Sequence, residues 1–347
     1  MTDFAATAVD MPDDAEVVSD FLYERRMTDG LPVIPPTPAR VEHMLSGTPR
    51  EAVDVIGRIP PANGTATVEK LAINAVMAGC KPEYMPVLIA AVEVVVQETF
   101  ALAGMQPTTN PLTPMIIVNG PIRRRIEMEG KTGAMGPGNR ANASIGRALR
   151  LVLINLGRAV PGDVDKCTQG FVGKFSLCIA ENEEESAWEP FHVSRGFSAE
   201  DDVITVVGVN ASNNIHDSSG EPSDLVKTLE GSLPSIGTAN VVDPHATPVL
   251  ALNPLHIQLL ASVGFDRGGL QRHLFEHCRL PADALSARRA HLRESEGEDQ
   301  YLVDGEIPLV NDPSNLLIVA CGGLQGGHSC FLSNGHYGHA ISRRINP

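Results

Sequence analysis

The stretch PMIIVNGP, residues 114 to 121, sets the fold class of this chain. Its apolar run ends in Gly-Pro, which predicts a short buried strand. A Gly-rich loop follows, and after it a helix is expected from about 142 to 156. Further strands are predicted at the apolar runs 175–180, 202–209, 247–253 and 315–322. Helical patterns lie between several of these runs, so we predict an α/β fold with a mixed or mostly parallel sheet flanked by helices.

The sequence before this strand is mainly helical. Helices are predicted at 13–29, 67–78 and 82–99. We therefore expect a helical N-terminal portion, 1–110, and an α/β domain, 111–347, although the two could form one integrated domain. The charged stretch 286–300 is expected to be a solvated surface excursion. No internal repeat is evident in the sequence.

The composition favours small-molecule substrates. The chain has 347 residues, of which 43% are hydrophobic and 20% charged, and its formal net charge is −15. No stretch gathers Lys and Arg into a basic stripe, and only 4% of the residues are aromatic. Nucleic-acid binding needs concentrated cations or stacking rings, so no nucleic-acid partner is expected.

The first residues, 1–22, lack the basic region and unbroken apolar run of a signal peptide. No later run approaches the about 20 apolar residues that a membrane span requires. We therefore predict a cytoplasmic protein that binds no membrane. A homo-oligomer is compatible with the sequence, which does not specify an oligomeric state.

The cysteines are spread through the chain without a CxxC pair, unlike a disulfide framework or a zinc ribbon. They are Cys80, Cys167, Cys178, Cys278, Cys321 and Cys330. Cys80 stands between two predicted helices, beside Lys81, and Pro82 suits the first turn of the second helix. The dipole of that helix and the ammonium group would favour a reactive thiolate. The alternative is that Cys80 is a small apolar filler at a tight helix–helix turn.

The loop GAMGPGNRANASIGRAL, 133 to 149, is a candidate substrate-binding segment. Its glycines let the backbone approach a ligand, and free N–H groups and arginines could hold a carboxylate or phosphate. The residues assigned to this role are Gly136, Gly138, Asn139, Arg140 and Asn142. The loop matches neither a Walker nor a GxGxxG pattern, so no nucleotide cofactor is indicated. A Gly-rich turn with incidental arginines is the alternative.

The stretch CIAENEEESAWEPFH, 178 to 192, places acidic residues directly after a predicted strand. Loops at the carboxyl ends of strands are where α/β folds place their sites. Glu181 and Glu183 are therefore candidates for proton transfer, with Trp188 as a substrate contact. The acidic run could also hold a divalent cation, or it could be a solvated loop.

The stretch ACGGLQGGHSCFLSNGHYGHA, 320 to 340, also follows a predicted strand. It offers sulfur and nitrogen ligands in Cys321, His328, Cys330, His336 and His339, although their spacing matches no standard zinc pattern. His328 is the preferred general base or thiolate partner for Cys80.

Four other histidines are not the first choice for the general base. His216 is a second candidate for the base. His256, His273 and His277 lie in predicted helices and are assigned to structure.

Several of these segments together resemble a known bacterial family. They are DGLPVIPPTPARVEHML (29–45), INAVMAGCKPEYMPVLIAAV (73–92), MIIVNGP (115–121), GPGNRANASIGRALRL (136–151), CIAENEEESAWEP (178–190) and LFEHCRLP (274–281). The family is associated with UGSC-type (cysteine or selenocysteine) proteins, which are distant kin of the selenoprotein B component of glycine-reductase-like systems. The resemblance covers roughly residues 20 to 345.

The resemblance implies thiol or selenol chemistry, a small-molecule substrate and a UGSC-type partner protein. Cys80 and the loop 181–185 lie in segments typical of the family. Two positions depart from it: Asn110 stands where a histidine is usual, and Gly327 precedes His328 where a lysine is usual. These departures indicate a different substrate.

From these observations we expect a thiol-dependent enzyme acting on a small anionic metabolite. Cys80 would be the nucleophile or redox thiol in a reductive or eliminative cleavage of a carbon–heteroatom bond, with Glu181, Glu183 and His328 moving protons. One alternative is a metal-dependent lyase or hydrolase built on the loop 181–185 and the C-terminal histidines. Another is a non-catalytic partner subunit of a UGSC-type protein.

Overall fold

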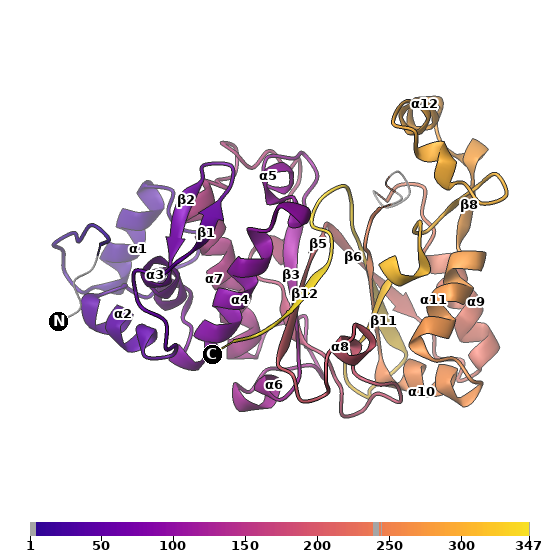
Figure 1. Ribbon diagram of the computed structural model, residues 1–347, viewed down its shortest axis with the longest axis horizontal. Helices are drawn as coiled ribbons and strands as arrows, with labels where there is room; N and C mark the ends of the chain where they lie inside the picture. The colour runs from indigo at the N-terminus through magenta and orange to yellow at the C-terminus, as the bar shows by residue number, and fades with distance from the viewer. Residues whose placement is uncertain (1–4, 239–242, 244, 347) are drawn as a thin grey trace.

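Two four-stranded sheets lie face to face in the middle of the molecule, and helices cover the outer face of each sheet (Figure 1). The computed structural model describes residues 5–238, 243 and 245–346. Both sheets contain parallel and antiparallel strands, which confirms the predicted α/β class with mixed sheets.

The strands of the first sheet are arranged in the order β12–β5–β3–β4. Their bounds are Ile341–Arg344, Val203–Val209, Thr113–Asn119 and Cys178–Ala180. The second sheet has the order β10–β7–β11–β6. Its bounds are Leu317–Ala320, Val249–Leu252, His328–Ser333 and Ala211–His216. Each strand predicted from an apolar run is present, as β3, β4, β5, β7 and β10.

Side chains alternate between two cores along each central strand. On β3, Met115 and Ile117 face the second sheet, whereas Ile116 and Val118 face the helices of the N-terminal side. Because successive side chains point to opposite faces, a strand buried on both faces must be apolar throughout. This explains why the β3 sequence is an unbroken run. The same alternation holds on β7, so the molecule has four layers in the order helix, sheet, sheet, helix.

The helices α4 and α7 cover the first sheet, and α3 packs against them on the side away from the sheet. The bounds of α3, α4 and α7 are Val68–Ala78, Met85–Val95 and Arg140–Gly157. Outside them lie α1 (Ala15–Glu24), α2 (Pro38–Leu45) and the hairpin of β1 (Val55–Ile59) and β2 (Gly64–Thr67). The core under these helices is continuous with residues of β3 and β5. The short helices on this side are η1 (Pro82–Tyr84), η2 (Glu98–Phe100), α5 (Leu102–Met105), α6 (Ile122–Arg125) and η3 (Val172–Lys174).

The helices α9, α10 and α11 cover the second sheet. Their bounds are Pro222–Ser232, Pro254–Ser262 and Arg267–His277. The short elements on this side are α8 (Phe191–Ser194), β8 (Arg279–Pro281), η5 (Ala282–Ala284), η6 (Glu298–Tyr301), β9 (Glu306–Pro308) and η7 (Pro313–Asn315). The stretch expected to be a loose excursion, 286–300, does project from the body but contains a helix, α12, Ala287–Ser295 (Figure 1).

The two sheets repeat one arrangement that the sequence did not reveal. The strands β3, β4 and β5 occupy the same positions in the first sheet as β7, β10 and β11 in the second. The fourth strands are exchanged, because β6 follows β5 but joins the second sheet, and β12 follows β11 but joins the first. The segments TPMIIVN (113–119) and TPVLALN (247–253) are equivalent in this repeat. The expectation of no internal repeat is therefore wrong.

The two crossing segments contact each other where the strands exchange. The Asn210 N–H donates to Ser333 O at 2.9 Å, and the Ser333 hydroxyl donates to Asn210 Oδ1 at 2.5 Å. The side chain of Asn334 donates to Gly208 O. An asparagine thus stands at each crossing.

In the described part of the chain, no single helix has both the length and the apolar composition to span a membrane. One pair, Pro82–Val95 with Glu98–Met105, meets the test only when taken together, and it is bent by 78°.

Candidate functional site

The carboxyl ends of β3, β4 and β10 meet at one end of the sheets. The Glu181 N–H donates to Val118 O at 3.1 Å, and the Asn182 N–H donates to Ala320 O at 2.9 Å. Strand β3 ends beside them at Asn119. Ligands of α/β proteins commonly bind at such strand ends. The acidic loop therefore begins at a position that suits a site.

Glu181 is fully buried within a set of donors. Its Oε2 accepts from the Phe191 N–H at 2.6 Å and from the amide of Asn119, and its Oε1 accepts from Arg267 Nη2 and the Ala320 N–H, both at 3.2 Å. Burial raises the pKa of the Glu181 carboxyl, and the charge of Arg267 and the backbone donors only partly offset this. The buried Glu181 carboxyl therefore keeps its proton to a higher pH than a free glutamate does.

Glu183 lies beside Glu181 and pairs with a buried arginine. Its Oε1 accepts from the Gly120 N–H at 2.8 Å and from Asn119 Nδ2 at 2.9 Å, and its Oε2 pairs with Arg123. Arg123 also binds Glu184 at 3.1 Å. Burial alone would lower the pKa of Arg123, but the two carboxylates outweigh it and raise that pKa. The amide of Asn119 therefore lies between two carboxylates.

His192 lies on α8, and its side chain is fully buried. Neither ring nitrogen has a hydrogen-bond partner among the described residues, and Nδ1 is 3.8 Å from Glu183 Oε1. In the same part of the structure, Asn119 Oδ1 and Arg267 Nη1 are also buried without hydrogen-bond partners. Such atoms are rare in proteins and commonly mark a place for a water or an ion.

These residues could hold a metal ion. Glu181, Glu183 and His192 each offer one ligand atom, and these atoms lie within 4.8 Å of one another. We call these three residues the Glu–Glu–His trio. Two carboxylates and an imidazole are ligands that divalent transition metals accept.

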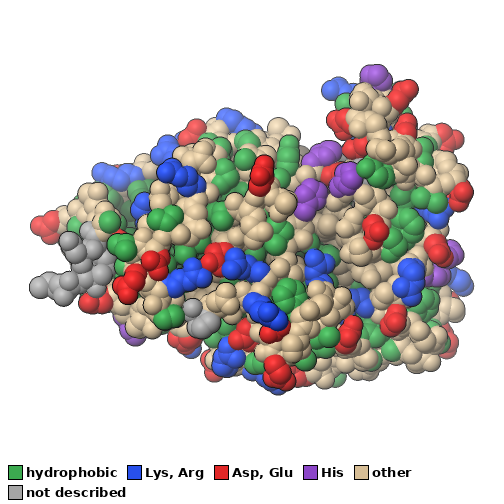
Figure 2. Space-filling model, in the orientation of Figure 1, with side chains coloured by type: hydrophobic (Ala, Val, Ile, Leu, Met, Phe, Trp, Pro, Cys, Tyr) green, Lys and Arg blue, Asp and Glu red, His purple; other side chains and the backbone are tan. Residues whose placement is uncertain are grey.

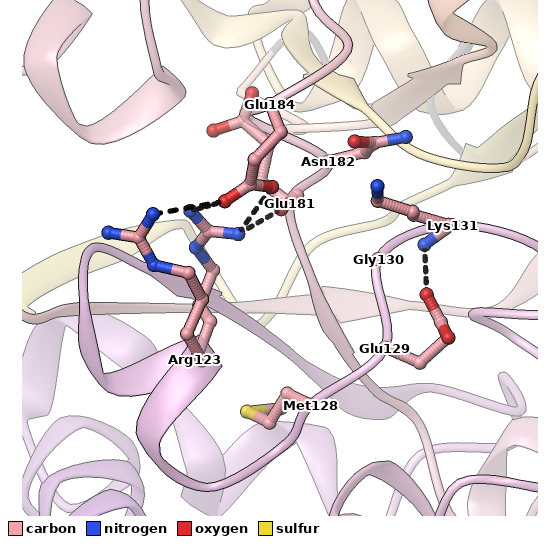
Figure 3. A pocket seen from close by; sticks show the side chains of 9 residues that line it. Arg123, Met128, Glu129, Gly130, Lys131, Glu181, Asn182 and Glu184 are labelled. Carbon is pink, nitrogen blue, oxygen red and sulfur yellow. Dashed lines mark hydrogen bonds and ion pairs between the residues drawn. The ribbon is translucent and has the colours of Figure 1, made fainter.

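A cavity of about 260 Å³ opens next to the trio (Figure 3). It is lined by Arg123, Arg124, Met128, Glu129, Gly130, Lys131, Glu181, Asn182 and Glu184. In Figure 3, Arg123 and Glu184 extend from one side, and Glu129 and Lys131 stand on the opposite side. Glu181 is the member of the trio that lines the cavity. The volume suits a small metabolite.

Charged residues of both signs surround the opening. Lys131 Nζ lies 3.0 Å from Glu185 Oε1, and Arg124 lies 3.8 Å from Glu184. Burial would raise the pKa of Glu184, but the hydrogen bond and charge of Arg123 outweigh it and lower that pKa. Acidic and basic side chains are also interspersed over the face drawn in Figure 2, without an extended basic area.

The structure contradicts the predicted thiolate at Cys80. Its side chain is buried in the core of the N-terminal side, and Sγ donates to Ser144 O at 3.3 Å. Burial raises the pKa of Cys80 to about 12, although Ser144, Arg140 and Arg147 act in the opposite direction. The prediction is wrong because the turn packs under α7, which removes water from the sulfur. Lys81 pairs with nearby carboxylates instead.

The Gly-rich loop is close to the cavity but turns its polar groups inward. Asn139 caps α7 by accepting from the Asn142 N–H at 3.0 Å. The amide of Asn142 binds both the N–H and the carbonyl of Glu129, which lines the cavity. Arg140 Nε donates to Gly79 O at 2.9 Å. The loop therefore positions a cavity wall, and Asn142 is the predicted residue with the clearest connection to it.

The glycines Gly136 and Gly138 shape the same loop. The Gly136 N–H donates to Gly133 O at 2.7 Å, and Gly138 has a φ of +122°, which strongly favours glycine. Neither residue lines the cavity.

Trp188 is buried in the outer core of the second half. Its Nε1 donates to Phe265 O at 2.8 Å, and its ring lies 5.9 Å from the guanidinium of Arg267. Trp188 is not among the residues that line this cavity, so its role as a substrate contact stays a prediction. The side chain instead supports the turn that carries Arg267.

The C-terminal histidines do not join the acidic loop. His328 is exposed at the start of β11, where Nδ1 is 3.2 Å from Asn214 Oδ1 and the ring stacks on His216 at 4.5 Å. It contacts neither Cys80 nor the trio in any hydrogen bond or ion pair among described residues. Its predicted role as the base for Cys80 therefore has no geometric support.

His336 belongs to a separate group. His336 Nδ1 lies 3.2 Å from Asp243, and Glu298 completes a second set of potential ligands. Burial, with the charge of Asp243, raises the pKa of Glu298 to about 7. Arg293 lies 3.6 Å from Glu298 and balances part of this charge.

Sequence reasoning missed four residues of the site. They are Asn119, Arg123, His192 and Arg267. Asn119 is the last residue of β3, Arg123 lies in α6 shortly after it, and His192 ends the acidic stretch, so the sequence carries a signal for these three. Arg267 has no signal in the sequence, because it reaches the site only through the packing of α11 against β10.

Comparison with known proteins gives no relative: no family model, no curated protein and no solved structure matches the chain. The resemblance to the UGSC-associated family therefore stays a prediction.

Proposed function

We propose that the chain is a metal-dependent lyase or hydrolase that cleaves a carbon–heteroatom bond in a small anionic metabolite. The Glu–Glu–His trio would hold the metal, and the adjacent cavity would hold the substrate. The observation that carries the proposal is His192, which is fully buried, has no hydrogen-bond partner for its ring nitrogens among the described residues and stands 3.8 Å from Glu183.

The charges around Asn119 support a cation at this position. Its amide nitrogen donates to both Glu181 and Glu183 and so occupies the space between two carboxylates. An amide carries only a partial positive charge, whereas a divalent cation would neutralise both groups. The oxygen of the same amide has no partner, and rotation of the amide would turn it toward the metal.

The ligand types narrow the choice of metal. Carboxylate and amide oxygens suit Mn²⁺ or Mg²⁺, and an imidazole nitrogen favours a transition metal. We therefore expect Mn²⁺ to bind more tightly than Mg²⁺.

The cavity supports the assignment of substrate and reaction. Arg124 and Lys131 bring positive charge to the opening and suit an anionic group. A bound cation would polarise a substrate carbonyl and lower the pKa of a coordinated water. The trio would hold this cation, which would supply the Lewis acidity and the activated water that hydrolysis or elimination at a carbon–heteroatom bond requires. Cys80 has no role in this scheme.

Mn²⁺ binding by variants of the Glu–Glu–His trio tests the proposed metal site. Protein treated with a chelator is titrated with Mn²⁺ and followed by electron paramagnetic resonance. We expect one tight site in the wild type and its loss in Glu183→Gln and His192→Asn. Glu185→Gln is the matched control, because Glu185 lies in the same loop but binds Lys131 outside the trio. Equal Mn²⁺ binding in all four proteins would contradict the proposal.

A substrate screen tests the reaction. Small hydroxy acids, amino acids and acyl amides are incubated with the Mn²⁺-loaded protein, and products are followed by NMR. We expect turnover of at least one compound in the wild type and none in His192→Asn. Turnover that is equally fast without metal, or only with an added UGSC-type protein, would favour another function.

A further inference from the structure

We propose that Glu230, His273 and His277 form a second, separate metal site, which binds Zn²⁺ and ties α9 to α11. Each of the three residues offers one ligand atom, and these atoms lie within 4.8 Å of one another. The site lies on the outer helical layer of the second half, on elements different from those that carry the Glu–Glu–His trio.

The helical spacing places both imidazoles on one face of α11. Residues four apart are neighbours on a helix surface, so His273 and His277 project from successive turns. Their ring centroids are 4.1 Å apart, and the ring planes differ by 19°. Two histidines at this spacing can bind one metal ion from a single helix.

The third ligand comes from the neighbouring helix. Glu230 lies on α9, and its Oε1 is 2.8 Å from Nε2 of His273. Ligands of a tetrahedral zinc ion, each at about 2.0–2.1 Å from the metal, are about 3.3 Å apart. The pair must therefore open by a few tenths of an ångström, which partly exposed side chains can do. The side chains of His273 and Glu230 are 25% and 28% exposed.

A backbone hydrogen bond sets the tautomer of His277. Its Nδ1 is 2.8 Å from the carbonyl oxygen of His273. A carbonyl only accepts, so Nδ1 carries the proton and Nε2 keeps its lone pair. Metal-binding histidines are commonly oriented in this way by a bond from the second ring nitrogen.

The ligand set favours zinc. Two imidazoles and one carboxylate, with room for water at a partly exposed position, are typical of Zn²⁺. The side chains that α9 and α11 bury beneath the site include Leu225, Leu229, Leu270 and Leu274. An ion held by both helices stabilises the folded state, because the three ligands do not come together in the unfolded chain. We therefore expect zinc to raise the melting temperature.

Zinc titration of single variants tests this site. Chelator-treated full-length protein is titrated with ZnCl₂, and both stoichiometry and melting temperature are measured. We expect the melting temperature of the wild type to rise by about 1–2 °C at saturation, as for roughly 1 kcal/mol in a chain of 347 residues. His273→Ala and His277→Ala should lose this rise and one equivalent of zinc. Glu230→Gln should weaken binding at least tenfold.

Two controls separate this site from the others. His291→Ala removes an exposed histidine on α12 and should keep the full response. His192→Asn should keep the part of the response that His273→Ala loses, because only the trio is changed, so the two metal proposals can fail independently. A zinc response in His273→Ala and His277→Ala equal to that of the wild type, or half-saturation only above about 100 µM, would overturn the proposal.

Discussion

The two halves of the molecule place an asparagine at the same point and use it differently. Asn119 ends β3 and Asn253 follows β7, each at the end of a Thr-Pro-initiated strand. Asn119 donates to the carboxylates Glu181 and Glu183. Asn253 instead caps α10 through the Leu255 N–H at 2.7 Å and donates to two backbone carbonyls of the loop after β10.

The two halves also differ in the residue that follows the parallel neighbour of this strand, which is β4 beside β3 and β10 beside β7. Glu181 follows β4, whereas Cys321 follows β10 in the second half. Both are buried, but only Glu181 is a carboxyl group, and it accepts hydrogen bonds from Asn119, Phe191, Arg267 and Ala320. The repeated fold thus supplies two equivalent positions at strand ends, and the side chains make a site of only one. In the second half, Asn253 at the equivalent position stabilises the fold by capping α10 and binding the loop after β10.

The largest loss of stability is expected when the carboxyl group of Glu181 is removed. Glu181→Ala leaves Arg267 buried without its carboxylate, and breaking such a buried pair costs about 3–5 kcal/mol. Cys321→Ala removes one buried atom and should cost about 0.5–1.5 kcal/mol, similar to loss of a methyl group. Urea unfolding measures both values. Equal losses would remove the contrast between the halves.

A double replacement sharpens the same test. Glu181→Leu with Arg267→Met replaces the pair by apolar side chains of similar volume, and such replacements are often neutral. Recovery of most of the stability, together with loss of Mn²⁺ binding, would show that the pair is kept for function.

The asparagines should respond differently to metal. Asn253→Ala loses a helix cap and leaves two carbonyls without a donor, at a cost of about 2 kcal/mol. This loss should be the same with and without Mn²⁺. Asn119→Ala leaves two carboxylates facing each other, so its loss should be about 2–3 kcal/mol in chelator and clearly smaller with Mn²⁺. An identical response of both variants to Mn²⁺ would break the comparison.

The unfolding free energy should depend on pH through Glu181 in the first half but not through the equivalent Cys321 in the second. Burial raises the folded-state pKa of Glu181 above its ordinary value of 4.5. At pH values between 4.5 and the raised folded-state pKa, the folded state binds more protons than the unfolded state. The unfolding free energy therefore falls as the pH rises through this range. Glu181→Gln should flatten the metal-free unfolding free energy across that window, while Cys321→Ser should keep the slope. An unchanged slope in Glu181→Gln would mean that another group titrates.

The smallest effect is expected at Cys80. Its thiol is buried and its pKa is raised to about 12, so iodoacetamide should not label it in the folded protein at neutral pH. Cys80→Ala should cost about 1 kcal/mol and leave Mn²⁺ binding unchanged. Rapid labelling, or loss of turnover in Cys80→Ala, would return the thiol to the mechanism.

The apolar strands were predictable because both of their faces are buried. The apolar runs at β3, β5, β7 and β10 are buried along almost their whole length, as the sequence pattern predicts for strands inside the core. Strand β6, with the sequence ASNNIH, was not predicted because it lies at a sheet edge and is mostly exposed. The repeat was hidden for the same reason, since the exchanged strands β6 and β12 carry little apolar pattern.

The site was only partly predictable. Glu181 and Glu183 were identified because charges directly after a buried strand are unusual. The prediction for Cys80 failed because local sequence shows the end of a helix but not the helix α7 that packs over it. His328 failed because its distance from the acidic loop depends on strand order, which no local pattern contains. Arg267 joins the site through tertiary packing alone.

The exchange of fourth strands has a consequence for biosynthesis. As the polypeptide leaves the ribosome, β5 is made long before its partner β12, so the edge of the first sheet stays open in the nascent chain. Unpaired edges of this kind invite pairing with other chains. The first sheet therefore cannot be completed until residues 341–344 have been translated, whereas β6 is already present when the other strands of the second sheet are made.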